Sequence, residues 1–351
     1  MLSVLCAPAY ALLLPEDRAD IMAHSYDGGG VNAQGPAMLV RKGNDTSFSV
    51  SPNYYVDNVS AASIDIEAQA SEFSETRTET GLGADYLVND TMVSIGIASS
   101  EEPDYIADAV SINMTQEMLG GMTTLNIGYS TGEDTVMRVD TDFSETIDRY
   151  QYSIGLSQVL TAKWLAGFNY EAITDKGYLA NPYRAARVLG AYVPEVYPGT
   201  RTSEAYSLTS INYFDHRGSL RFYYRIFTDT WAIEADTIEV SYNKYFGERH
   251  LFEIGYRTYS QSAASFYSDN FSEELDFMSR DKELSTFESN TLKFKYSFEL
   301  FKQGEGFFSK GMFATSIALT EYDYDDYTHY RTGEAYSYNA TVTQLMLSLW
   351  F

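Results

Sequence analysis

The chain has 351 residues, a formal net charge of -25 and an aromatic content of 15%, with Tyr 30 and Phe 20. This acidic balance argues against a nucleic-acid-binding protein, which needs a basic face. The abundance of aromatic residues argues against intrinsic disorder. The sequence also lacks a run of ~18 apolar residues, so it predicts no transmembrane helix.

The first eleven residues, "MLSVLCAPAYA", are apolar and end in the small-x-small pattern of a signal-peptidase site. A basic n-region is missing, so we predict a truncated signal peptide over residues 1–11 and a single barrel domain over 12–351. The only cysteine, Cys6, lies in this segment. Leu5 before it is too large for a typical lipoprotein cleavage site, and we predict no lipid anchor. A mature chain without cysteine excludes disulfides, thiolate metal sites and haem attachment, and we predict no cofactor.

Apolar and polar residues alternate with a period of two along most of the chain, as β-strands with one apolar face require. The stretches 123–129, 151–156, 220–226 and 291–300 show this pattern most clearly. The predicted strands have about 10 to 14 residues. They are longer than usual strands of ~5 to 6 residues and long enough for the ~9 to 11 of a tilted membrane-crossing strand.

Short and long connections alternate from one end of the chain to the other. Tight turns are predicted at 43–45, 89–91, 119–121, 160–162, 215–218, 247–250 and 302–306. Longer polar connections are predicted around 27–36, 57–76, 99–106, 131–146, 173–203, 228–232, 261–286 and 321–335. Short periplasmic turns and longer extracellular loops are typical of outer-membrane barrels. Seven turns and eight loops predict sixteen antiparallel strands, or fourteen if the first hairpin lies outside the wall, with both termini periplasmic.

The chain ends in "TVTQLMLSLWF", which keeps the period of two up to its last residue. We predict that this strand pairs with the first one and closes the barrel. Leu345, Leu347, Leu349 and Phe351 would face lipid. Alternating apolar residues ending in Phe resemble the C-terminal signal that the barrel-assembly machinery recognises. Aromatic residues beside the tight turns, such as Trp164, Phe214 and Phe246, favour an interfacial girdle.

The polar face of the strands between 218 and 300 carries charges that would cost ~2–4 kcal/mol each for Arg or Lys facing lipid at mid-bilayer. We therefore place them in the lumen. They either line a water-filled pore or pair across the lumen and fill it. The lumen-lining candidates are Arg221, Arg225, Glu239, Glu253, Arg257, Lys293, Lys295 and Glu299.

Two of the longer loops have distinctive compositions. The loop around 173–203 contains Pro182, Pro194 and Pro198, which predict an ordered path that constricts the barrel or covers its mouth. The last loop, "EYDYDDYTHYR", contains Asp323, Asp325 and Asp326. These acids are weak cation-binding candidates, and because calcium-loop spacing is missing we interpret the segment as a solvated acidic loop.

Catalysis finds little support in the sequence. His216 and His250 lie at tight turns, whereas His24 and His329 lie near the longer loops. A nucleophile–histidine–carboxylate arrangement at one rim, as a hydrolase requires, is not predicted.

Several stretches resemble a family of predicted Gram-negative outer-membrane proteins of unknown function. They include "LPEDRADIMAHSYDGGG", "ITDKGYLANPYR", "PEVYPGTRTS", "RIFTDTWAIEAD" and "RTYSQSAASFYSDNF". The resemblance implies an outer-membrane barrel that is often encoded near a small lipoprotein, a thioredoxin-like protein and an enzyme that attaches FMN to proteins. It therefore implies a periplasmic redox partner, but it assigns no catalytic residues.

Together these features predict a porin-like channel for small solutes or ions, surrounded by outer-membrane lipid and lipopolysaccharide. One alternative is a non-conducting scaffold that docks or sheathes a periplasmic redox protein. A second is an outer-membrane enzyme.

Overall fold

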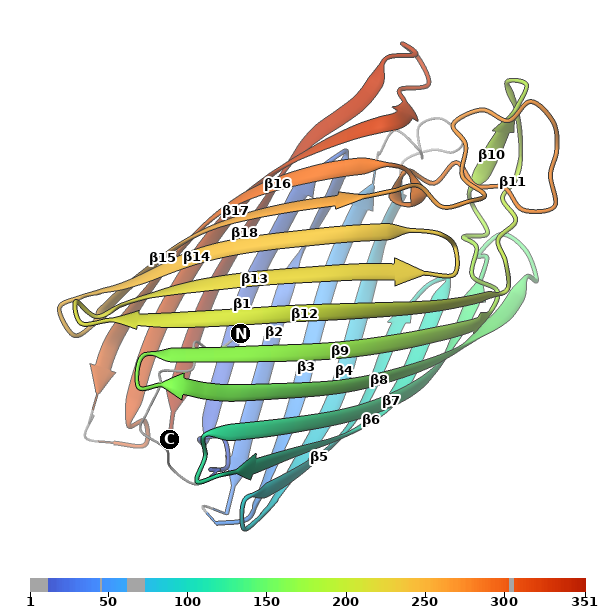
Figure 1. Ribbon diagram of the computed structural model, residues 1–351. Coiled ribbons are helices and arrows are strands. Elements are labelled where there is room, and N and C mark those ends of the chain that lie inside the picture. Colours follow the sequence, from blue (N-terminus) through green and yellow to red (C-terminus); the bar gives the residue numbers. More distant parts are fainter. Residues whose placement is uncertain (1–11, 45, 62–72, 303–305) are drawn as a thin grey trace.

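The protein is a closed antiparallel β-barrel in the computed structural model, which describes residues 12–44, 46–61, 73–302 and 306–351 (Figure 1). The predicted signal peptide at 1–11 lies outside the described residues. The first eight barrel strands are β1 (Arg18–Gly28), β2 (Val31–Gly43), β3 (Phe48–Ala61), β4 (Phe73–Val88), β5 (Thr91–Glu102), β6 (Tyr105–Met118), β7 (Thr123–Met137) and β8 (Ser144–Thr161). The other eight are β9 (Trp164–Gly177), β12 (Thr200–Phe214), β13 (Gly218–Asp229), β14 (Glu234–Phe246), β15 (His250–Gln261), β16 (Phe287–Lys302), β17 (Lys310–Thr328) and β18 (Ala335–Trp350).

Each barrel strand pairs with its neighbours in sequence, and β18 pairs with β1 to close the circuit. The register at this seam runs from Arg18 opposite Trp350 to Gly28 opposite Ala340. The prediction of sixteen strands, closed by the C-terminal strand, is therefore confirmed. The first hairpin, β1–β2, belongs to the wall, and the fourteen-strand alternative is wrong.

The short turns lie at one end of the barrel, which we call the turn end. The start of β1 and the end of β18 lie at the same end. The predicted turns are confirmed in their described residues, although Asp45 and 303–305 are not described. Positive backbone φ angles, such as 52° at Asn89, show why turn-forming residues occupy these positions.

Two predicted long loops at the opposite end, the loop end, are in fact tight turns. β1 and β2 pair up to Gly28 and Val31, and Gly29 and Gly30 have φ angles of 60° and 78°. Two consecutive positive φ angles make a two-residue hairpin turn, for which glycine is well suited. β5 and β6 likewise pair up to Glu102 and Tyr105. The polar composition of these segments misled the prediction, because strand ends beyond a membrane are polar as well.

The two longest described connections fold together at the loop end. Residues 178–199 contain the hairpin β10 (Ala185–Val188) and β11 (Ala191–Pro194), and residues 262–286 contain the short 3₁₀ helix η1 (Lys282–Leu284). We call these two segments the loop lobe. Bridges join Val188 to Phe271 and Val196 to Met278, and Figure 1 shows the lobe beyond the ends of the barrel strands. The predicted ordered path of the proline-containing loop is confirmed.

Buried apolar residues hold the loop lobe to the barrel rim. Trp231 and Ile233, between β13 and β14, pack with Ala264, Phe266 and Leu284. The lobe is also fastened to the β17–β18 hairpin by Arg280. Its guanidinium donates to the Tyr327 hydroxyl at 3.1 Å and the Thr328 carbonyl at 2.8 Å.

Among the described residues, no helix has the length and apolar character needed to span a membrane.

Candidate functional site: the barrel lumen

The outer face of the barrel carries a belt of exposed apolar side chains. Leu82, Ile97, Val110, Ile154 and Leu208 are between 44% and 53% exposed, and they alternate with residues that face inward. Exposed aromatic rings at the turn end include Trp164, Phe214, Phe246 and Phe307. This belt is where a lipid-facing surface is expected.

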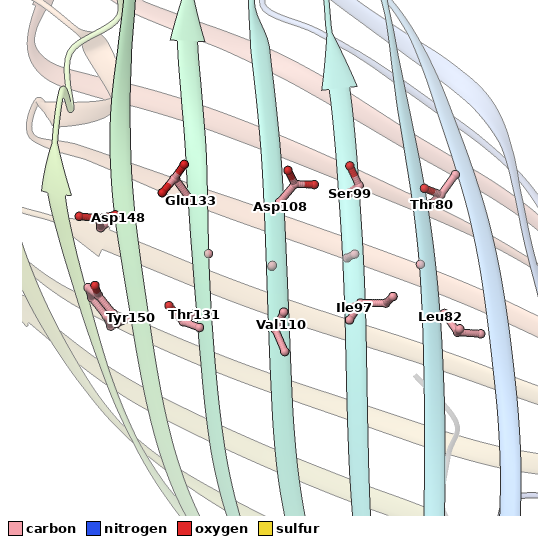
Figure 2. A pocket seen from close by; sticks show the side chains of 14 residues that line it. Thr80, Leu82, Ile97, Ser99, Asp108, Val110, Thr131, Glu133, Asp148 and Tyr150 are labelled. Carbon is pink, nitrogen blue, oxygen red and sulfur yellow. The ribbon is translucent and has the colours of Figure 1, made fainter.

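A shallow groove across β4–β8 lies at the edge of this belt that is nearer the loop end. Figure 2 shows two rows of outward side chains, with Thr80, Ser99, Asp108, Glu133 and Asp148 in one row and Leu82, Ile97, Val110, Thr131 and Tyr150 in the other. Residues within each row are paired in register across the strands. The outer surface therefore changes from mainly apolar to polar and acidic within one step of two residues.

The inward face of the barrel wall is polar, and part of it is exposed at mid-height. Asn113, Asn126 and Asn169, on β6, β7 and β9, are inward-facing and exposed. Gln344 on β18 and Arg257 on β15 are also exposed and face inward from the other side of the circuit. Asn113 and Asn169 reach over glycines of neighbouring strands, because a Cβ on Gly128 or Gly155 would lie 2.5 Å or 3.1 Å from their Oδ1 atoms.

The eight predicted lumen residues occupy inward positions on β13–β16. Arg221 Nη1 donates to Glu239 Oε1 at 2.8 Å, and Lys293 Nζ lies 3.4 Å from Glu253 Oε1. Arg225 instead lies 3.4 Å from Glu171 of β9, a partner that the sequence pattern missed.

The other predicted residues make fewer polar contacts. Among the described residues, no ion pair joins Arg257 or Lys295 to a carboxylate within 4.0 Å, and Arg257 lies over the ring of Tyr259 at 5.8 Å. Glu299, near the turn end, is paired in register with Met312. The structure therefore joins four of the eight residues into two ion pairs within the set.

A second set of charged residues lies towards the loop end on β6–β13. Arg149 bonds Asp134, lies 3.4 Å from Asp175 and donates to the Tyr105 hydroxyl at 3.0 Å. Further round the wall, Arg201 Nη2 lies 2.6 Å from Asp229, whose side chain is fully buried. These charged residues lie at the ends of the predicted strands or in the predicted loops. Their sequence positions therefore indicated loops, whereas the structure places them on the lumen wall.

His24 of β1 bonds the Asp57 carboxylate of β3 and stacks on Tyr55 with a centroid distance of 4.8 Å and an interplanar angle of 5°. In register, Gly35 of β2 lies between His24 and Asp57. The sequence prediction missed this group, because the three residues come from three strands. A glycine within a strand was the available signal, since such a glycine often marks a close approach.

The acidic candidates Asp323, Asp325 and Asp326 lie in β17, which continues to Thr328, so the predicted acidic loop is wrong over this stretch and the three acids are not gathered into one site. Asp323 is exposed on the outer face of β17, while Asp326 Oδ1 accepts the Thr286 N–H at 2.9 Å. Among described residues, Glu75, Glu102 and Asp104 have carboxylate oxygens within 4.8 Å of one another. They lie at the loop end of β4–β6.

The remaining histidines are placed as predicted. His216 and His250 lie at the turn end, where their rings contact Phe214 and Phe298, and His329 lies in the β17–β18 connection. In the described part of the chain, His24 with Asp57 is the one histidine–carboxylate pair.

A closed antiparallel circuit of sixteen strands, with an apolar belt outside and polar side chains inside, defines the outer-membrane β-barrel class. The chain matches the family described as "Protein of unknown function (DUF3570)" over residues 58–152 and 137–310. It belongs to this family. No curated protein matches the chain.

Solved structures of similar shape share little sequence with this chain. A bacterial polysaccharide outer membrane secretin has a TM-score of 0.52 at 6% identity, covering 96% of this chain and 99% of that one. The siderophore receptors PirA from Acinetobacter baumannii and Pseudomonas aeruginosa have TM-scores of 0.47 and 0.48 at 8% and 9% identity, over 93% and 90% of this chain. The matched region spans 57% and 60% of these two receptors. At such identities the likeness concerns the fold alone.

Proposed function

We propose that the protein is a channel of the bacterial outer membrane that passes small hydrophilic solutes or ions. The observation that carries this proposal is the exposure of inward polar side chains at mid-height, including Asn113, Asn126, Asn169 and Gln344. A packed lumen would shield these groups with other side chains. Sixteen-stranded barrels are wide enough to leave an aqueous channel, so water is the natural partner of these amides.

The apolar belt sets the proposed orientation in the membrane. The turn end, with both termini, lies in the periplasm, and the loop end lies outside the cell, as in barrels of this class. The acidic row beginning with Asp108 and Glu133 then lies at the level of the lipopolysaccharide headgroups. The C-terminal residues Leu345, Leu347, Leu349 and Phe351 would be read by the barrel-assembly machinery before the strand is paired.

Charges on opposite walls support selective passage rather than simple leakage. Along the circuit, β14 lies eight strands from β4, which is half of the sixteen. The inward face of β13–β16 carries more cations than acids, whereas on β4 and β5 Glu75 and Glu102 lie with a single cation, Arg77, which is 3.6 Å from Glu102. Charged side chains that line a water-filled pore act on the permeating solutes beside them.

The non-conducting scaffold is the competing proposal. It requires a lumen closed to water, in which every charge is paired. Exposed Arg257 and Lys293 argue against such a lumen. A periplasmic redox partner, implied by the family resemblance, would dock at the turn end in either case. Catalysis has no comparable support.

Conductance of the purified protein in a planar lipid bilayer tests the channel. We expect discrete current steps that grow with salt concentration. The double variant Lys293→Ala with Lys295→Ala should conduct and shift the reversal potential towards cations. If the parent never conducts and the variant unfolds at a much lower temperature, the lumen is closed and the scaffold replaces the channel. Loss of one partner of a buried ion pair costs ~3–5 kcal/mol, whereas loss from a hydrated wall costs little.

A further inference from the structure

The cationic wall of the lumen contains two groups of the same design, each with two cations and one carboxylate. In the first group, Glu239 of β14 lies between Arg221 of β13 and Arg257 of β15. Its carboxylate accepts from Arg221 at 2.8 Å, while Arg257 is its direct partner in register. Glu239 therefore forms an ion pair with Arg221 alone, and this group of two guanidinium groups and one carboxylate retains a net positive charge.

The second group repeats this arrangement on β15 and β16. Glu253 is paired in register with Lys295, but its carboxylate lies 3.4 Å from Lys293 Nζ. Lys293 and Lys295 are two residues apart on the same face of β16. Glu253 therefore forms an ion pair with Lys293 alone, and Lys295 has no ion pair among the described residues.

The two groups form a continuous ladder along the wall. Arg257 is opposite Thr291 in register, Gly255 is opposite Lys293, and Glu253 is opposite Lys295. The three cations therefore follow one another in steps of two residues, or about 7 Å along a strand. Gly255, opposite Lys293 in register, adds no side chain to this row.

From this ladder we propose that the lumen binds and preferentially passes small oxyanions, such as phosphate or carboxylate-bearing solutes. This inference rests on the proposed channel. Arg257 is the entry position, because its guanidinium is exposed and has no carboxylate partner among the described residues, and a guanidinium matches the geometry of an oxyanion. Lys295 is the next uncompensated cation towards the turn end.

The net charge of -25 does not oppose this assignment. Part of the acidic excess lies outside the ladder, on the outer face at Asp108 and Glu133 and on the opposite wall at Glu75 and Glu102. Charges separated by water over more than ~8–10 Å are largely screened at physiological salt. An ion in the ladder responds mainly to the nearest charges, which are positive.

The test is the reversal potential of single channels under a KCl gradient. We expect a preference for Cl⁻ in the parent, and a fall of at least about twofold in the ratio of Cl⁻ to K⁺ permeability in Arg257→Gln and in Lys295→Gln. Inorganic phosphate should reduce the Cl⁻ current of the parent but not that of Arg257→Gln. Arg257→Lys, which keeps the charge, should retain the preference.

Lys163→Gln is the matched control, because it removes a cation that is paired with Asp215 at the exposed turn end. A conducting parent that prefers K⁺ overturns the anion assignment and leaves the channel standing. Equal ratios of Cl⁻ to K⁺ permeability in Arg257→Gln and Lys163→Gln also overturn the anion assignment and leave the channel standing.

A parent that does not conduct overturns the channel instead. The ladder is then judged by calorimetric titration of the detergent-solubilised protein with inorganic phosphate. Binding that is lost in the double variant of Arg257→Gln and Lys295→Gln supports the anion site, and absence of binding to the parent overturns it.

Discussion

The His24 side chain reaches over Gly35 to bond the carboxylate of Asp57, so that two strands separated by a third are joined inside the barrel. The Tyr55 ring stacks on the imidazole, and its hydroxyl lies 3.1 Å from Nε2. A Cβ on Gly35 would meet the backbone of Val56 and Asp57, so the glycine allows β3 to approach β2 closely beside this contact. It fixes the register of β1–β3 independently of the backbone ladder.

Gly35→Ala should destabilise the barrel. A Cβ at this position would lie 1.8 Å from the Val56 carbonyl oxygen, so the backbone must shift, at a cost of ~1–3 kcal/mol. The measurement is the temperature at which the folded band is lost in heat-modifiable electrophoresis. Gly167→Ala is the control, because its Cβ meets nothing closer than 3.5 Å. Equal transition temperatures for the two variants would contradict the close approach over Gly35.

The His24–Asp57 bond should show strong coupling in a double-mutant cycle. Asp57→Ala leaves the His24 ring without its carboxylate, at ~1–3 kcal/mol for an unsatisfied buried group. His24→Ala removes the same bond from the other side. The double variant should therefore be less destabilised than the sum of the single variants. Additive transition temperatures would show that the two side chains act independently.

The final strand should be indispensable for assembly. Leu349→Asp puts a charge on the outward face of β18, and deletion of Phe351 removes a ring that stacks on Phe307 at 5.1 Å. Both variants should fail to accumulate in the outer membrane, as measured by membrane fractionation and heat-modifiable mobility. Leu349→Ile keeps the apolar face and should assemble normally. Normal assembly of both altered chains would refute the assembly role.

Protease tags should report the orientation. A cleavage site inserted after Leu189, which is 77% exposed at the tip of β10–β11, should be cut on intact cells. A site inserted after Glu248, in the β14–β15 turn, should be cut only after the outer membrane is permeabilised. The reverse result would place the loop lobe in the periplasm.

Arg280 should control the loop lobe without affecting the barrel. Its side chain forms an ion pair with Asp269 at 2.8 Å and is 2% exposed. Arg280→Met removes this ion pair and the hydrogen bonds to Tyr327 and Thr328, and breaking a buried ion pair costs ~3–5 kcal/mol. We expect rapid proteolysis within 262–286, while the barrel keeps its heat-modifiable mobility. A lobe that stays resistant would show that its apolar core suffices.

The stability of the lobe should fall as pH rises. Burial raises the pKa of the Glu195 carboxyl above its ordinary value of 4.5, even though this group accepts from Tyr197 and from the Arg280 N–H at 2.6 Å each. The folded lobe therefore binds the proton more tightly than the unfolded segment, and this contribution is lost as pH rises from 4.5 through the raised pKa. Proteolysis rates measured across this window should increase with pH in the parent but not in Glu195→Gln. Glu274→Gln, an exposed change in the same lobe, should keep the parental dependence.

The sequence by itself determined the fold class and the closure of the barrel, and it left sixteen or fourteen strands, between which the structure decided. The period of two has a local cause, because alternate side chains of a strand face opposite sides of the sheet. The alternation from Leu345 to Phe351 therefore shows directly which residues face outward. The positions of the tight turns are equally local. Where a polar strand end continues beyond the apolar belt, as at Tyr26 and Glu102, the sequence has no signal that separates strand from loop, so two tight turns were predicted as longer connections.

Only the tertiary structure decided which charges meet. Strand register around a closed circuit joins Arg225 to Glu171, brings His24 to Asp57 and leaves Arg257 without a carboxylate partner within the described chain. These relationships depend on side-chain reach across one or two strands, whereas periodicity specifies only which face a residue occupies. The folding of 178–199 against 262–286 has the same origin, because segments far apart in sequence share one apolar core that neither could bury alone.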